Sequence, residues 1–142
     1  MILVVNADGL AERITIDGVV GFKYENEKFE FKTDLPNHEV AIKFILDKLI
    51  EKNIIKNIDD ISGVGFRVVH GSNISKSSII DKKVFEIIKD AVKLAPLHNP
   101  GAITAIEAVQ KIMPKAKMVA CFDTAFHTDI PEKNYIYPTP YE

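Results

Sequence analysis

SGVGFRVVHG, residues Ser62 to Gly71, is the stretch that decides the fold class. Its β-forming residues run without interruption up to Val69, which predicts a buried central strand. A second strand of this kind is predicted at 118–122, directly before Asp123. Because helical segments separate the two strands, we expect a parallel pair within an α/β fold.

Three helices are predicted between and before these strands. The first covers Val40 to Ile50, with Pro36 and Asn37 near its start. Asp81 is placed to cap a second helix that carries apolar residues from Val84 to Leu94. The third begins at Asn99-Pro100, a capping amide followed by proline at the first helical position, and Pro114 stops it.

The N-terminal segment has the patterns typical of β-strands, a short apolar run followed by apolar and polar residues that alternate with a two-residue period. Residues 2–5 predict a short buried strand, and 6–9 a turn after it. Residues 12–17 alternate as in a half-buried strand, and 22–24 with 29–31 predict a hairpin. With a loop expected from Thr124 onward, the order fits a mixed sheet flanked by helices, as in ribonuclease-H-like domains.

Composition indicates a single globular domain. The chain has 142 residues, 46% of them hydrophobic and 27% charged. A net charge of −2 argues against nucleic acid or an anionic membrane as the main partner. No apolar run approaches the roughly 20 residues of a membrane span, and the N-terminus lacks the basic region of a signal peptide. Cys121 is the one cysteine, so no internal disulfide is possible, which favours a cytoplasmic protein. Its apolar neighbours predict that it is inert core.

Arg67 is the first candidate site residue. An arginine inside an apolar strand is costly to bury unless it is paired. It could therefore form a structural ion pair, or it could clamp an anion, since guanidinium matches carboxylate and phosphate geometry.

The candidate histidines lie at a strand end and at a helix start. His70 follows the predicted strand, where a histidine is most often simply hydrogen-bonded. His98 precedes the predicted helix cap, beside unpaired N–H groups and the positive end of the helix. That position suits a group that binds a developing anion, and equally an ordinary histidine of the capping region.

Asp123 ends an apolar strand, where α/β folds commonly place metal or substrate ligands. It could also cap the loop or pair with Arg67. A metal site built from His70, His98, Asp123 and His127 is a further alternative, although no short ligand spacing supports it.

Three motifs resemble the acetate kinase family, which also contains propionate and butyrate kinases. Arg67 to Gly71 match the family's Arg-Val-Val-His-Gly-Gly run, with Ser72 in place of the second glycine. The segments 94–100 and 122–127 match closely and in the same order, and 9–14 resembles the family's early strand. Nearly the whole chain aligns with the N-terminal portion of a family member.

The resemblance implies a ribonuclease-H-like α/β fold of the actin and sugar-kinase superfamily. Residues 1–142 would form a single N-terminal acetokinase-like domain, incomplete and without the second, nucleotide-binding domain. The implied reaction is the reversible, magnesium-dependent transfer of the ATP γ-phosphoryl group to acetate, which gives acetyl phosphate and ADP. The implied partners are acetate or propionate and phosphate, with the family's homodimer as the implied assembly.

Carried over, the family's roles fall on a few residues of this chain. Arg67 would bind the carboxylate or the transferring phosphoryl group, and His98 would stabilise that group. Val69 and Leu97 would line the pocket for the acetate methyl. Asp123 would act at the reaction centre as a magnesium or arginine positioner, because acetate is already ionised and needs no general base. Asn6 would be a second magnesium contact, and the resemblance assigns no residue of this chain to the nucleotide.

The chain also departs from the family pattern. The family's Gly-Ser-Ser-Ser turn and the strand with a lysine should follow Asn6, but Ala7 here leads directly into Asp8. An aspartate where phosphate would approach is electrostatically unfavourable. The family's Gly-Phe-His-Gly segment and adenosine-binding domain do not occur before Glu142. We therefore expect the chain alone to have little or no kinase activity. A non-catalytic domain that binds a small carboxylate, phosphate or a partner protein, and a metal hydrolase, are the alternatives.

Overall fold

The computed structural model describes residues 5–139, which fall into two compact units. Unit 1 comprises residues 1–64 and 103–117, and unit 2 comprises 65–102 and 118–142, each within the described range. Strand β4, helix α3 and strand β6 each contribute residues to both units. Among residues 5–139, no helix combines the length and the apolar character needed to cross a bilayer.

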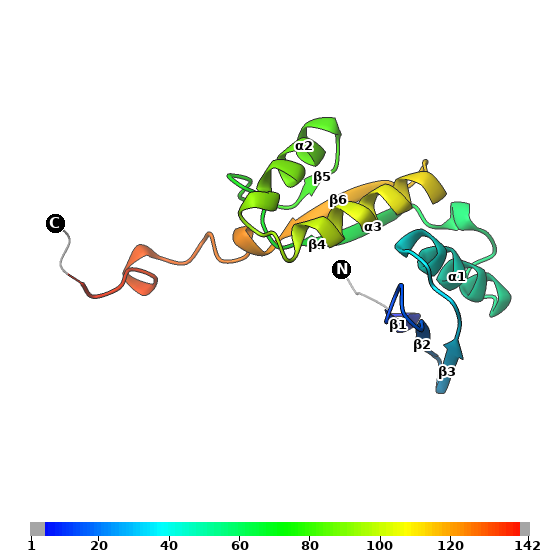
Figure 1. The fold of residues 1–142 in the computed structure, drawn as a ribbon. Helices are drawn as coiled ribbons and strands as arrows, with labels where there is room; N and C mark the ends of the chain where they lie inside the picture. Colours follow the sequence, from blue (N-terminus) through cyan, green and yellow to red (C-terminus); the bar gives the residue numbers. More distant parts are fainter. Residues whose placement is uncertain (1–4, 140–142) are drawn as a thin grey trace. The chain divides into compact units, whose positions relative to one another are not determined.

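Unit 1 contains an antiparallel meander and the helix α1 (Figure 1). The strands are β1 (Ala7–Glu12), β2 (Val19–Tyr24) and β3 (Glu27–Lys32), and β2 pairs with both neighbours. Helix α1 (His38–Glu51) begins where Asn37 accepts a hydrogen bond from the Val40 N–H at 2.9 Å. The predicted hairpin and the first helix are confirmed.

The N-terminal strand boundaries were predicted wrongly. Residues 6–9 do not form a turn, because β1 begins at Ala7 and pairs along its length with β2. Residues 13–17 form the connection between these strands instead of a strand of their own. Arg13 and Thr15 have left-handed φ angles of 56° and 77°, which end the extended backbone. The predicted strand at 2–5 falls almost entirely outside the described residues.

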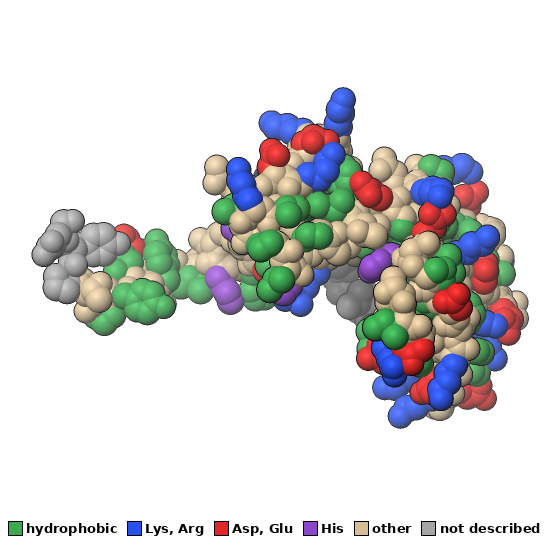
Figure 2. Space-filling model, in the orientation of Figure 1, with side chains coloured by type: hydrophobic (Ala, Val, Ile, Leu, Met, Phe, Trp, Pro, Cys, Tyr) green, Lys and Arg blue, Asp and Glu red, His purple; other side chains and the backbone are tan. Residues whose placement is uncertain are grey.

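The core of unit 1 lies between the meander and α1. Val20, Leu35 and Ala41 are buried there, packed against partly buried neighbours that include Phe44. Phe22 of β2 stacks on Phe29 and Phe31 of β3. Lys48 of α1 lies over the Phe31 ring, and Lys52, the C-cap of α1, lies over the Phe29 ring. Lysine and arginine side chains are interspersed with acidic ones on the visible face (Figure 2).

The second sheet has the order β4-β6-β5, from β4 (Gly63–Val68), β5 (Ser78–Ile79) and β6 (Lys117–Phe122). The strand at β4 was expected to be central and buried, but among residues 5–139 it lies at the edge of this sheet. Its residues alternate in exposure and only Val68 is fully buried. Strand β6 occupies the centre, and β5, which no pattern predicted, pairs with it antiparallel.

Two helices connect β4 to β6. Helix α2 (Lys82–Asp90) begins after Asp81, whose side chain accepts from the Val84 N–H at 2.8 Å, and one short 3-10 turn (Ala91–Lys93) follows it. Helix α3 (Asn99–Ile112) ends before Pro114. Both helices are confirmed, and with the two sheets they give the predicted α/β class. Between Asp123 and residue 139, the C-terminal segment has only the short 3-10 turns at 123–125 and 132–134, as a loop prediction requires.

Candidate functional site

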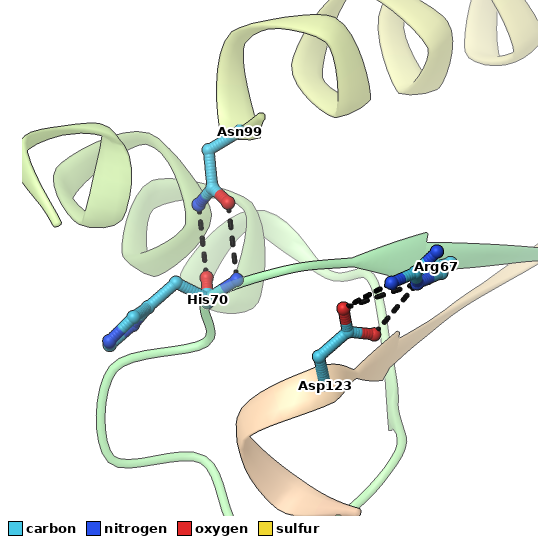
Figure 3. Close-up of polar contacts among 4 residues, drawn as sticks. All are labelled: Arg67, His70, Asn99 and Asp123. Atoms are coloured by element: carbon cyan, nitrogen blue, oxygen red, sulfur yellow. Dashed lines mark hydrogen bonds and ion pairs between the residues drawn. The ribbon is translucent and has the colours of Figure 1, made fainter. Parts of the chain in front are cut away.

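The C-terminal ends of β4 and β6 lie at the same edge of the sheet in unit 2 (Figure 3), as expected for the predicted parallel pair. The segment after β4 carries Val69, His70 and Gly71, and the segment after β6 carries Asp123 and Thr124. The two segments are joined directly, because the Gly71 N–H donates to Thr124 Oγ1 at 3.3 Å. This edge is where α/β folds gather ligand-binding side chains.

Gly71 is buried against β6, and its lack of a side chain is required by that contact. A Cβ atom at this position would lie 2.4 Å from the Phe122 ring. Phe122 is itself only 4% exposed, so its ring has little room to move. The glycine therefore lets the loop after β4 approach the end of β6.

Arg67 and Asp123 form a bidentate ion pair across this edge. Arg67 Nε donates to Asp123 Oδ1 at 2.9 Å and to Oδ2 at 3.1 Å, and Nη2 donates to Oδ2 at 2.8 Å. The sequence had left open whether Arg67 forms an ion pair or clamps an anion, and the described geometry contains the pair. The Arg67 side chain is 80% exposed, so its remaining N–H groups face solvent and can receive an anion.

The pair fixes the charge of both partners. The hydrogen bonds from Arg67 lower the pKa of the Asp123 carboxyl; partial desolvation opposes this, and the charges of Arg67 and His98 add smaller lowering effects. The same contact raises the pKa of Arg67. Asp123 is therefore ionised throughout the neutral range.

A hollow of about 430 Å³ lies beside the pair within unit 2. Four of the predicted site residues line it: Val69, Leu97, His98 and Asp123. His70 and Thr124 also contribute to its wall, with apolar atoms from the segment 94–96. The hollow thus places an apolar surface next to an imidazole and a carboxylate. Arg67 does not line the hollow itself but is hydrogen-bonded to Asp123, which does.

His98 occupies the N-terminal cap position of α3, one residue before Asn99, which the sequence predicted as the cap. Its carbonyl accepts from the Ala102 N–H at 3.4 Å, as the residue before the first helical turn does. The helix therefore begins at Asn99, and the imidazole of His98 stands at its positive end.

Asn99 has a role that the sequence did not reveal. We predicted it as a capping amide, but it is fully buried and its side chain serves other segments. Oδ1 accepts from the His70 N–H at 3.2 Å, and Nδ2 donates to the His70 carbonyl at 3.0 Å, as Figure 3 shows. Nδ2 also donates to the Ile88 carbonyl at 3.2 Å. No pattern in the sequence around Asn99 indicates that its side chain is buried or bonds to His70.

The turn after His70 has a backbone that favours glycine. Ser72 adopts a φ of 55°, and it stands where the motif that Arg67 to Gly71 resemble has its second glycine. The Ser72 N–H donates to His70 Nδ1 at 3.0 Å. A neutral His70 ring that accepts at Nδ1 carries its proton on Nε2.

The remaining candidates lie elsewhere or differ from expectation. Asn6 precedes β1 in unit 1, and His127 lies in the exposed C-terminal segment with its ring against Phe126. Among residues 5–139, no three His, Cys, Asp or Glu side chains gather as metal ligands, so the four-residue metal site is absent there. Cys121 is exposed on β6, which corrects its prediction as core.

Comparison with known proteins gives the same family across the whole chain. The acetokinase family model matches residues 2–142. The acetate kinase of Mesoplasma florum is 75% identical over 134 residues, which cover 94% of this chain and 34% of that protein. The acetate kinase of Clostridium kluyveri is 50% identical over 140 residues, which are 96% of this chain and 35% of that one. The chain therefore spans about a third of the length of these curated relatives.

Solved structures agree with the sequence comparison. The crystal structure of Porphyromonas gingivalis acetate kinase superposes with a TM-score of 0.84 at 34% identity, over 96% of this chain and 35% of that chain. A propionate kinase from Francisella tularensis gives a TM-score of 0.80 at 38% identity, with the same coverage of both chains. These similarities show the fold predicted from the motifs.

Proposed function

The chain belongs to the acetokinase family, and we propose that the hollow of unit 2 binds the small carboxylate and the phosphoryl group of an acetate kinase-type reaction. In that reaction the carboxylate oxygen of acetate attacks the γ-phosphorus of ATP, and ADP leaves. The observation that carries the proposal is the hollow itself, which combines an apolar surface with His98 and Asp123, and with Arg67 bound to Asp123.

Arg67 is proposed to bind the anionic substrate. Asp123 holds its Nε and Nη2 sides, which orients the planar group and leaves its Nη1 side to a carboxylate or phosphoryl oxygen. Phosphoryl transfer to acetate brings two anions together, so its barrier is lowered mainly by positioning and by neutralising charge. A preoriented guanidinium does both.

His98 is proposed to stabilise the transferring phosphoryl group. Its imidazole lines the hollow at the start of α3, where the helix end favours negative charge. A hydrogen bond from the ring to a phosphoryl oxygen would strengthen as charge spreads over the oxygens during transfer.

Asp123 is proposed as a positioning group, not as a base. Its pKa is lowered by Arg67, so it stays ionised, and acetate is itself ionised and has no proton to give up. An exposed carboxylate is also the kind of ligand that Mg²⁺ takes in phosphoryl-transfer sites. When bound there, Mg²⁺ would neutralise phosphate charge, and ATP is the implied phosphoryl donor.

Val69 and Leu97 are proposed to contact the acyl group. Both line the hollow, and Leu97 is 89% exposed, so its side chain is accessible to a bound acyl group. Such an open surface does not exclude water from the reaction. We therefore propose that the 142 residues bind substrate but transfer phosphate slowly or not at all.

The wider setting follows from the same family membership. We propose that residues 1–142 act as an N-terminal acetokinase-like domain in the cytoplasm, with acetate or propionate and phosphate as partners. Exposed apolar side chains of unit 2 outside the hollow, among them Ile79 and Phe126, would then contact further protein, as in a homodimer.

Calorimetric titration with acetyl phosphate tests the proposed site, because this molecule carries both the acyl and the phosphoryl group. We expect saturable binding that Arg67→Ala weakens by about tenfold or more, the loss of one charged hydrogen-bonding group. Arg13→Ala is the matched control, since Arg13 is also an exposed arginine paired with an aspartate, but in unit 1. Equal weakening by both substitutions would overturn the proposed role of Arg67.

Turnover separates an enzyme from a binding domain. Acetate-dependent ADP formation is measured for the chain with Mg²⁺ and ATP. Binding of acetyl phosphate without turnover is the expected result, and it favours the non-catalytic alternative for these 142 residues. Turnover that Arg67→Ala abolishes would show instead that unit 1 and unit 2 suffice for catalysis.

A further inference from the structure

The two walls of the hollow in unit 2 meet at one buried side chain. Val69 and His70 belong to one wall, and Leu97 and His98 to the other. Asn99 directly follows His98 and hydrogen-bonds the main chain of His70. Among residues 5–139, Asn99 is the one polar residue that is buried, and it has no exposed surface.

The three hydrogen bonds of Asn99 fix the loop after β4 in two ways. Its amide pairs with both the N–H and the carbonyl of His70, at 3.2 Å and 3.0 Å, so it holds the loop through both main-chain groups of one residue (Figure 3). The bond to the Ile88 carbonyl, at 3.2 Å, holds the amide itself against the last turn of α2. Burial makes each bond costly to break, because a freed polar group would be left without water.

We propose that Asn99 is a positioning residue that sets the width of the hollow and thereby the acyl-chain length it accepts. Val69 is bonded to His70, and Leu97 lies two residues before Asn99, so the distance between these apolar side chains depends on the Asn99–His70 contact. A planar amide is suited to this task because it offers a donor and an acceptor side by side. The inference rests on the proposed carboxylate site.

The unsubstituted protein provides the first test, by NMR titration with acetate, propionate and butyrate. With the acyl group between Val69 and Leu97, each added methylene should make more contact with these two side chains. The resonances of the Asn99 side-chain amide and of the His70 N–H should therefore shift in graded order along the series. Inorganic phosphate, which has no acyl group, should leave them nearly unchanged.

A substitution supplies the second test. Asn99→Ser keeps a polar group but is too short to reach both groups of His70, so the wall should loosen. We expect the preference for acetate over propionate to change by up to about tenfold, the lower range for one methylene in an apolar pocket. Affinity for inorganic phosphate should be unchanged. Asn134→Ala, at an exposed asparagine of the same unit, is the control and should alter neither.

The outcomes separate this inference from the proposed function. Equal weakening of acetate, propionate and phosphate by Asn99→Ser would assign Asn99 a merely structural role and overturn the inference alone. Carboxylate binding to the unsubstituted protein without graded shifts would also overturn the inference alone. This NMR result is sufficient if Asn99→Ser does not fold. No carboxylate binding at any residue of the hollow would overturn the proposed function and the inference with it.

Discussion

Unit 1 and unit 2 are stabilised by different kinds of contact. The core of unit 1 is apolar, with Val20 and Leu35 each 1% exposed beneath α1. Unit 2 also has buried apolar residues, such as Val68 and Ile88, but in addition it buries Asn99 and brings Gly71 against the Phe122 ring. Apolar packing tolerates many side-chain combinations, whereas a buried amide and a close backbone approach tolerate few. The unit that carries the proposed site is thus the one with the more exacting contacts.

The largest effect on stability should come from the apolar core of unit 1. Leu35→Ala removes a buried side chain and leaves a cavity, which should lower the free energy of unfolding by about 2–5 kcal/mol. Urea denaturation measures this loss. Leu97→Ala in unit 2, at an exposed leucine, should change stability by less than about 0.5 kcal/mol. A large loss at Leu97 would mean that this residue is core and not pocket wall.

Gly71→Ala should produce the next largest effect, in unit 2. The added Cβ would meet the Phe122 ring at 2.4 Å, so we expect a loss of about 1–3 kcal/mol from overpacking. Hydrogen exchange should show the loss in unit 2 and not in the β1–β3 meander. Gly65→Ala is the matched control on β4, because no atom lies within 4 Å of its Cβ position. A neutral Gly71→Ala would refute the close contact.

Helix capping allows the same mechanism to be compared in both units. Asn37 caps α1 in unit 1 and Asp81 caps α2 in unit 2, each with a side-chain bond to a main-chain N–H. Asn37→Ala and Asp81→Ala should each cost about 1 kcal/mol, measured by thermal unfolding. Asp47→Ala, on the exposed side of α1, should be near neutral. No loss on either substitution would contradict the capping bond at that helix.

The helices of this chain were predictable because their signals are local. Asn37 and Asp81 are caps recognisable from neighbouring residues, and Pro114 ends α3 where it should. The strands needed information from outside their own sequence. Residues 14–16 alternate like a strand, yet pairing of Glu12 with Val19 makes them a connection between strands. The edge position of β4 likewise depends on its partners.

The grouping of residues in the candidate site was predictable where those residues end strands or begin helices. Val69, Leu97, His98 and Asp123 line one hollow, as parallel strand ends and a helix start would arrange them. The buried bonds of Asn99 and the left-handed backbone of Ser72 arise only when separate segments meet. Cys121 was misjudged because apolar neighbours along a strand do not show which face is covered.

The smallest effect on stability should come from the Arg67–Asp123 pair, because exposed ion pairs contribute little. Its pH dependence is more informative. Since Arg67 lowers the pKa of Asp123, the pair is complete above the ordinary value of 3.8 and is lost as the pH falls through the lowered value. The carboxyl carbon resonance of Asp123 should titrate below pH 3.8, and Arg67→Gln should raise that midpoint. A midpoint at or above the ordinary value in the unsubstituted protein would contradict the pair.

The central claim is that the hollow of unit 2 binds a small carboxylate with the help of Arg67. The most direct measurement is an NMR titration of the chain with acetate, compared with the Arg67→Gln and Arg13→Gln variants. We predict saturable shifts at Val69, Leu97 and His98 that Arg67→Gln removes and Arg13→Gln leaves unchanged. Shifts that do not saturate, or that survive Arg67→Gln, would contradict the claim.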